Sequence, residues 1–233
     1  MHRFFTDPSN IHGDTIRLSE EDFAHIRVLR LRPDELFTVC DGAGADYICR
    51  LCDRDQAGIA EIVERQTSRG ESAIKCHVFL AFSKSLDFAV QKSVELGAHS
   101  ITIFPSDRSP PGAIKTARLQ KIALEAAKQS GRGIVPAVTA EASFKHAATK
   151  AVDCEASLFC HETEKTRLKH VLDGCESVET FSIMTGPEGG FTAVEAELAL
   201  AAGMTAVSLG PRVLRCETAP LAALAAVMYH TEF

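Results

Sequence analysis

The sequence lacks tryptophan altogether and is poor in glycine and proline, with 15 glycines and nine prolines among 233 residues. That proportion excludes a fibrous or largely disordered chain, because both classes need far more of these two residues. No uninterrupted apolar stretch reaches about 18 residues, so we expect no membrane span. Residues 1–8 contain no apolar run of signal-peptide length, so we expect no secretory leader. These absences leave a folded globular chain, long enough for one large domain or two modest ones.

The sequence also lacks the cysteine framework that staples small secreted proteins. Its eight cysteines lie scattered at positions 40, 49, 52, 76, 154, 160, 175 and 216. Most lie in apolar runs, where a free cysteine behaves as a small hydrophobic residue, and a chain of this length has little need of disulfides. We therefore expect reduced thiols and a cytoplasmic protein. Cys49 and Cys52 should point to opposite faces of a strand, and no second pair has ligand spacing, so we predict no metal site.

The net charge of −6 excludes a protein that is held on nucleic acid by its overall field, because neutralising phosphates needs lysine and arginine. A local basic face is still compatible with this charge. Arg27, Arg30 and Arg32 lie close together and are candidates for such a face. The other interpretation of the three arginines is a solvated helix end.

Residues 1 to about 70 are typical of a small β-barrel or sheet around one helix. Ser19 and Asp22 resemble a capping box that opens a helix over residues 20–30. Short alternating segments predict strands at 36–41, 46–52 and 58–64. Asp41-Gly42-Ala43-Gly44 supplies turn residues between the first two of these strands. The small and polar residues 68–75 predict a linker.

After the linker, strands and helices alternate. Apolar runs predict strands at 76–82, 101–104, 156–160, 181–185 and 205–209. Helical patterns predict helices at 86–96, 116–130, 164–172, 193–202 and 219–230. Near-uniform apolar strands that alternate with helices indicate a parallel sheet covered on both faces, so the fold class is α/β. Ligands of such sheets bind beyond the carboxyl ends of the strands, so the loops there should carry the chemistry.

The first candidate loop is Thr185-Gly186-Pro187-Glu188-Gly189-Gly190-Phe191, which follows the strand at 181–185. Thr192 and Glu195 form a capping box for the next helix, but capping does not explain the run Gly-Pro-Glu-Gly-Gly. Glycines let a backbone approach a ligand closely. The loop lacks the lysine and the spacing of a phosphate loop, which disfavours a nucleotide-binding enzyme. We therefore predict a ligand loop rather than a purely structural turn.

The second candidate loop runs from Leu209 to Pro220 and contains Gly210-Pro211-Arg212-Val213-Leu214-Arg215-Cys216-Glu217-Thr218-Ala219. Thr218 and Pro220 are suited to the start of the last helix. Apolar residues, two arginines and a glutamate on one loop could enclose an amphipathic ligand. Since the two loops follow strands that are neighbours in the sequence, we predict that they line one pocket.

Together these two loops resemble the C-terminal signature of the SPOUT superfamily of methyltransferases, and within it the RsmE family. Further matches occur in the family's order along nearly the whole chain, at Met1-His2-Arg3-Phe4-Phe5, 25–32, Lys84, 95–97, Arg108-Ser109, 125–127, 129–130 and 132–136. The chain departs from the family at Lys128, where members commonly carry an acidic residue. It also has Pro33-Asp34-Glu35 in place of a Gly-Asp turn. Neither departure touches the two loops, so they bear on RNA contacts rather than on methyl transfer.

The resemblance implies a PUA-like RNA-binding β-barrel over residues 1–70 and a SPOUT-type parallel sheet with a trefoil knot over residues 75–233. It also implies a homodimer with each cofactor pocket near the subunit interface. The implied function is transfer of a methyl group from S-adenosylmethionine to N3 of a uridine in 16S ribosomal RNA. The substrate would be the free RNA or the small ribosomal subunit.

The resemblance also assigns residues to the site. The implied cofactor-binding residues are His161, Glu162, Thr185, Gly186, Pro187, Glu188, Gly189, Gly190, Leu209, Gly210, Val213, Leu214, Arg215, Thr218 and Ala219. The implied RNA-binding residues are Arg3, His25, Arg27, Arg30, Arg32, Lys84, Arg108 and Arg132. For His161 and Glu162, a surface pair is the other interpretation.

The chemistry of uridine methylation indicates which residues could be catalytic. Uridine N3 carries a proton, so methylation needs a base or a cation that stabilises the anion. Glu217 is the candidate base and Arg215 the candidate cation, although Glu217 could equally hold its loop by accepting backbone hydrogen bonds. Two alternative functions stay open, namely a SPOUT enzyme for another RNA site, such as a transfer RNA, and a non-catalytic ribosome-assembly factor that binds RNA.

Overall fold

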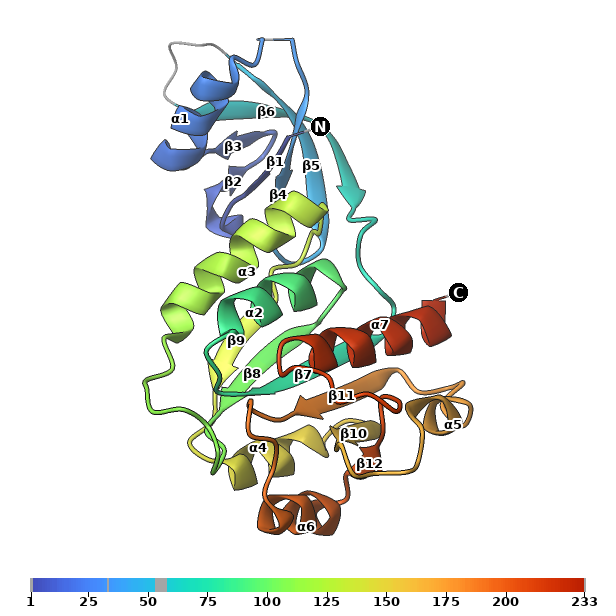
Figure 1. Cartoon of the computed structure of the whole chain (residues 1–233). Helices are drawn as coiled ribbons and strands as arrows, with labels where there is room; N and C mark the ends of the chain where they lie inside the picture. Colours follow the sequence, from blue (N-terminus) through green and yellow to red (C-terminus); the bar gives the residue numbers. More distant parts are fainter. Residues whose placement is uncertain (1, 33, 53–57, 233) are drawn as a thin grey trace. The chain divides into compact units, whose positions relative to one another are not determined.

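The computed structural model describes residues 2–32, 34–52 and 58–232 (Figure 1). The chain divides into two compact units, of which unit 1 comprises Met1–Glu71 with Ala127–Val135 and unit 2 comprises Ser72–Ala126 with Pro136–Phe233. The sequence-based division into domains at 1–70 and 75–233 stays a prediction. In the structure, residues 127–135 group with unit 1. Pro33, one of the departures from the family, lies outside the described residues.

Unit 1 is a curled six-stranded sheet with one α-helix. Its elements are β1 (Arg3–Phe5), a 3-10 helix (Pro8–Asn10), β2 (Ile11–His12), β3 (Thr15–Arg17), α1 (Glu20–Leu29), β4 (Phe37–Cys40), β5 (Ala45–Leu51) and β6 (Ile59–Thr67). The strand order is β1-β4-β5-β6-β3-β2, and every pair except β1–β4 is antiparallel. Phe4, Phe37, Ile16 and Ile26 are among the side chains that fill its core.

The local signals in unit 1 act as predicted. The Ser19 side chain accepts a hydrogen bond from the Asp22 backbone and caps α1. The carboxylate of Asp41 accepts from the backbone N–H groups of Ala43 and Ala45, at 2.8 and 3.0 Å, in the turn between β4 and β5. Cys49 is buried and Cys52 exposed, so these two side chains do lie on opposite faces. The short strands β1, β2 and β3 were missed, because two or three residues are too few to show a pattern.

Unit 2 is a six-stranded sheet with helices on both faces. Its strands are β7 (Lys75–Ala81), β8 (Ser100–Phe104), β9 (Ala137–Ala140), β10 (Ala156–Cys160), β11 (Thr180–Thr185) and β12 (Thr205–Val207). Its helices are α2 (Leu86–Glu95), α4 (Phe144–Ala151), α5 (Leu168–Leu172), α6 (Ala193–Ala202) and α7 (Thr218–Glu232), while α3 (Thr116–Ser130) begins in unit 2 and its residues from Ala127 onward belong to unit 1. The order is β12-β10-β11-β7-β8-β9 with all pairs parallel, so the predicted parallel sheet and the α/β class are confirmed.

The two faces of this sheet carry different helices (Figure 1). Helices α4 and α6 share a core with alternate residues of the sheet, including Phe79, Phe159 and Met184. Helices α2 and α7 contact each other on the opposite face. In the described residues, no helix has both the length and the apolar character needed to cross a membrane. The trefoil knot implied by the resemblance stays a prediction.

Unit 2 differs from the predicted elements mainly in three places. Strand β9 and helix α4 were missed, since Val138 is the one buried residue of β9 and α4 is rich in alanine and polar residues. The helix predicted over 164–172 begins only at Leu168, because the Glu164 side chain accepts from the next two backbone N–H groups and holds a turn there. Strand β12 ends at Val207 rather than at Leu209.

Candidate ligand-binding site

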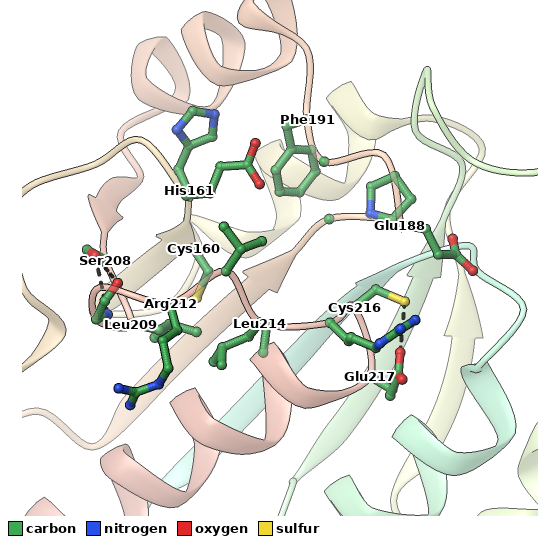
Figure 2. Close-up of a pocket in the computed structure, with 18 of the residues that line it drawn as sticks. Cys160, His161, Glu188, Phe191, Ser208, Leu209, Arg212, Leu214, Cys216 and Glu217 are labelled. Carbon is green, nitrogen blue, oxygen red and sulfur yellow. Dashed lines mark hydrogen bonds between the residues drawn. The ribbon is translucent and has the colours of Figure 1, made fainter.

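A cavity of about 280 Å³ lies at the carboxyl ends of three adjacent strands, β12, β10 and β11 (Figure 2). We call residues 185–191 the glycine loop and residues 208–219 the arginine loop; they follow β11 and β12, and residues 161–162 follow β10. The lining residues are Cys160, His161, Glu162, Gly186, Pro187, Glu188, Gly190, Phe191, Ser208, Leu209, Gly210, Pro211, Arg212, Val213, Leu214, Arg215, Cys216, Glu217 and Ala219. As predicted, the two loops line one pocket, at the place where parallel sheets bind ligands.

The glycine loop folds tightly beside the cavity. Gly190 has a positive φ of 69°, and its N–H donates to the carbonyl of Pro187 at 3.0 Å, which closes a turn. A Cβ at Gly186 would lie 3.2 Å from the ring of Phe191, which is buried and stacks near Phe159 with centroids 4.6 Å apart. The loop therefore presents backbone to the cavity at Gly186 and Gly190 and one aromatic wall at Phe191.

The arginine loop forms the opposite wall. Gly210 has a φ of 119°, a conformation that favours glycine, and its N–H donates to the Ser208 hydroxyl at 3.3 Å. Leu214 is half-buried, whereas Val213 is 80% exposed at the edge of the cavity. Arg215 accepts two hydrogen bonds at its carbonyl, from the N–H groups of Thr218 and Ala219, and these start α7.

The third wall follows β10. The imidazole of His161 stacks on Phe159, with centroids 5.7 Å apart and planes 17° apart. Its Nδ1 lies 2.9 Å from the Thr163 hydroxyl. Glu162 packs against the glycine loop, since a Cβ on Gly190 would lie 3.4 Å from a Glu162 carboxylate oxygen. His161 and Glu162 are therefore cavity residues rather than an unrelated surface pair.

Three residues predicted to bind the cofactor do not line the cavity. Thr185 is the buried last residue of β11, Gly189 faces Arg108, and Thr218 opens α7. Six lining residues were absent from the predicted set, namely Cys160, Phe191, Ser208, Pro211, Arg212 and Cys216. Four of these lie within the two motifs quoted from the sequence. The signal for Cys160 and Ser208 would have been their position at the ends of neighbouring strands.

The ionisable groups of the cavity give it mixed charge. Glu162, Glu188 and Glu217 bring carboxylates, and Arg212 and Arg215 bring guanidinium groups. The pKa of Glu217 is lowered, first by a hydrogen bond from its own backbone N–H and then by the thiol of Cys216, which donates to its Oε2 at 3.2 Å.

The cavity thiols are held in the protonated form. Burial raises the pKa of Cys216 to about 11 and that of Cys160 to about 12, so both are protonated at neutral pH. A thiol, unlike a thiolate, is a weak nucleophile. The cavity therefore offers an electrophilic ligand no thiolate to attack it.

Half of the predicted RNA-binding residues are exposed in unit 1. His25 and Arg27 lie on α1, Arg30 ends that helix with a φ of 56°, and Arg32 follows it. All four are solvent-exposed. Lys128, the departure from the family, lies 3.6 Å from the Asp22 carboxylate of the same unit.

The other half make internal contacts, through the side chains of Arg3, Arg108 and Arg132 and through the backbone N–H alone for Lys84. Arg3 forms an ion pair with Asp46 at 2.8 Å, and Arg132, which is 4% exposed, forms one with Glu71 at 2.7 Å. In unit 2, the Lys84 backbone N–H donates to the Glu188 carboxylate at 3.0 Å, and Arg108 donates to the glycine loop. Arg3 and Arg132 are thus parts of the framework of unit 1.

The comparisons with known proteins match RNA methyltransferases along nearly the whole chain. A family model described as an RNA methyltransferase domain matches residues 70–228, and one described as an RNA methyltransferase PUA domain matches residues 18–63. Ribosomal RNA small subunit methyltransferase E of Bacillus subtilis is 30% identical over 250 residues, with 100% of this chain and 98% of that protein covered. Its namesake from Synechocystis is 32% identical, with coverages of 97% and 77%. The crystal structure of the Neisseria gonorrhoeae enzyme of that name, bound to S-adenosylmethionine, superposes with a TM-score of 0.87 at 35% identity over 99% of this chain and 98% of that one.

Proposed function

The chain belongs to the RNA methyltransferase family, and on that premise we propose that it transfers the methyl group of S-adenosylmethionine to N3 of a uridine in 16S ribosomal RNA. The observation that carries this proposal is the single cavity that the glycine loop and the arginine loop form at the ends of β11 and β12. The relative from Neisseria gonorrhoeae, which is similar over almost its whole length, holds S-adenosylmethionine. The small-subunit RNA is taken from the names of the relatives.

The cavity residues fit this cofactor chemically. Pro187, Phe191 and Leu214 offer apolar surface of the kind that an adenine ring needs. The carboxylates of Glu162 and Glu188 suit a cationic sulfonium and ammonium, and a guanidinium group suits a carboxylate. Next to the cavity, the Thr185 hydroxyl is buried and has no hydrogen-bond partner within the described residues. This hydroxyl can therefore form a hydrogen bond with a ligand. When bound, S-adenosylmethionine supplies an activated methyl group.

Among the chain's own residues, Arg215 is the better candidate for promoting the reaction. Uridine N3 must lose its proton to attack, and with no side chain assigned as the base this proton passes to solvent water; a cation at the uracil carbonyl groups lowers the cost of the resulting anion. Glu217 fits the role of a base less well, because its pKa is lowered while an effective base needs a pKa near the working pH. We assign Glu217 to holding the arginine loop, because its carboxylate accepts hydrogen bonds from its own N–H, from the Cys216 thiol and from the Ser85 hydroxyl outside the loop.

RNA binding is proposed for the exposed basic residues. Arg27, Arg30 and Arg32 would contact backbone phosphates from unit 1, the unit that contains the match to the PUA model. Lys84 and Arg108 lie beside the glycine loop in unit 2 and would contact RNA near the cavity. The target uridine must be unpaired or flipped out of its helix for N3 to reach the cofactor.

A homodimer, a trefoil knot and a cytoplasmic location complete the proposal; the first two come from the family resemblance and the third from the scattered cysteines. Light scattering on the purified protein tests the dimer. A mass of one chain, at a concentration where the enzyme is active, would contradict it.

The decisive experiment is methylation of ribosomal RNA from a strain that lacks its own uridine-N3 methyltransferase, followed by mapping of the modified nucleotide. The assay compares naked 16S RNA with assembled small subunits. We expect one N3-methyluridine in 16S RNA. Modification of another site or of transfer RNA would identify a different substrate, and calorimetry that detects no binding of S-adenosylmethionine would leave a non-catalytic RNA-binding factor.

A further inference from the structure

The loop after β8 is tied to the glycine loop across a large distance in the sequence. Arg108 donates from Nη1 to the carbonyl oxygen of Gly189 at 2.8 Å and to that of Phe191 at 3.4 Å. The aliphatic part of the side chain lies against Gly189, because a Cβ there would be 3.1 Å from Cβ of Arg108 and 3.3 Å from its Cδ. Arg108 thus touches the side of the glycine loop away from the cavity, since Gly189 is not among the lining residues.

Glu195 holds the residues that precede Arg108. Its side chain is 2% exposed, and its Oε1 accepts from the Ser106 hydroxyl at 2.7 Å and from the Asp107 N–H at 3.0 Å. Its Oε2 accepts from the N–H of Thr192 at 2.8 Å, which is the local capping box. One buried carboxylate therefore fixes both the residues before Arg108 and the residue that follows the glycine loop.

A third contact comes from the loop after β7. The Glu188 carboxylate accepts from the Lys84 N–H at 3.0 Å. Together with the bonds that Arg108 donates and those that the Glu195 carboxylate accepts, this contact holds the middle and the end of the glycine loop. Hydrogen bonds from a charged donor are stronger than neutral ones, so we expect the bonds from Arg108 to matter most for the position of Gly189 and Phe191.

We propose that Arg108 is a positioning residue for cofactor binding, which holds the glycine loop in its ligand-ready shape through the carbonyl groups of Gly189 and Phe191. This inference rests on the proposed function. It assigns Arg108 to the shape of the cavity, in addition to the RNA contact predicted from the resemblance. The two roles can be told apart by experiment, because loss of the contacts between Arg108 and the glycine loop weakens cofactor binding even when no RNA is present.

The test compares Arg108→Ala and Arg108→Lys with Arg118→Ala as the matched control. Arg118 is an exposed arginine of unit 2 that pairs with Asp87 and does not line the cavity. Calorimetry measures S-adenosylmethionine binding without RNA, and single-turnover methylation is measured at saturating cofactor and RNA. We expect Arg108→Ala to weaken cofactor binding about tenfold, as the loss of a hydrogen bond from a charged group does. The saturated rate should change less than about threefold, Arg108→Lys should recover part of the affinity, and the control should match the wild type.

Gly189→Ala probes the same contact from the other side and covers the case in which Arg108→Ala folds poorly. Its new methyl group would press on Arg108, so cofactor affinity should fall, and the double variant should lose less than the sum of the two single losses. Wild-type cofactor affinity in Arg108→Ala, with weaker RNA binding alone, would overturn this inference and leave the proposed function intact. A wild-type protein that binds no S-adenosylmethionine would overturn both.

Discussion

Arg3 and Asp46 form a two-pronged ion pair inside unit 1, with Nη1 donating to Oδ1 at 2.9 Å and Nη2 donating to Oδ2 at 2.8 Å. The side chain of Asp46 is 2% exposed and that of Arg3 is 17% exposed. Asp46 also accepts a hydrogen bond from the Ser68 hydroxyl. Arg3 thereby joins β1 to β5, and its guanidinium additionally donates to the carbonyl of Arg132 at 3.3 Å.

We expect Arg3→Ala to lower the free energy of unfolding by about 3 kcal/mol, because it leaves a buried carboxylate without its partner. The measurement is urea unfolding followed by circular dichroism. Arg50→Ala is the matched control, since Arg50 pairs with Glu61 on the surface and its loss should cost at most about 1 kcal/mol. Unchanged stability in Arg3→Ala, combined with weaker RNA binding, would instead restore Arg3 to the RNA contacts.

The same pair predicts a pH dependence. Burial raises the pKa of the Asp46 carboxyl, but the hydrogen bonds from Arg3 and Ser68 outweigh burial and hold it below its ordinary value. A carboxyl whose pKa is lower in the folded state stabilises the fold above its unfolded pKa of about 3.9, and this contribution is lost as pH falls through the folded pKa. The stability difference between the wild type and Asp46→Asn should therefore be full at pH 6 and shrink below about pH 4. A difference that is constant down to pH 2.5 would contradict this explanation.

The catalytic assignment predicts opposite results for two neighbouring residues. Arg215→Ala should lower the single-turnover rate roughly a hundredfold at saturating cofactor, as loss of a group that stabilises a developing anion does. Glu217→Gln should keep that rate within about threefold, because a carboxyl of lowered pKa is a poor base. Glu217→Gln that abolished methyl transfer while cofactor affinity stayed normal would make Glu217 the base after all.

The basic cluster of Arg27, Arg30 and Arg32 predicts a change in salt dependence. Reversing all three charges should weaken RNA binding and reduce the slope of log K against log salt by about 2, since each phosphate contact on a single strand contributes roughly 0.7. Filter binding at several salt concentrations measures both. Arg17→Glu, at an exposed arginine of β3 outside the cluster, serves as the control. An unchanged slope in the triple variant would leave these arginines as a solvated helix end.

Local signals predicted local structure well in this chain. The bounds of α3, β10 and α6 agree with the sequence patterns. The capping residues Ser19 and Thr192 start the helices that they were expected to start. Such signals are reliable because a cap is completed within three or four residues, so the sequence contains both partners side by side.

The partners that the arginines contact could not be predicted in the same way. The resemblance assigned Arg3 and Arg132 to RNA, whereas each is bound to a carboxylate that lies 43 or 61 residues away. A charged residue next to an RNA-binding motif has the same pattern whether it faces solvent or a buried partner. Only the packing of unit 1 distinguishes the two.

The sequence by itself determined the composition of the two loops, the caps that end them and the strands that precede them, because these depend on backbone preferences of neighbouring residues. Only the tertiary structure decided that β12, β10 and β11 lie side by side and bring residues 160–162 into the same cavity. It also decided that Glu195, a simple capping residue by pattern, reaches Ser106 and Asp107. Strand order and the partners of buried polar groups depend on how the whole sheet is buried. The spacing of neighbouring residues does not encode this.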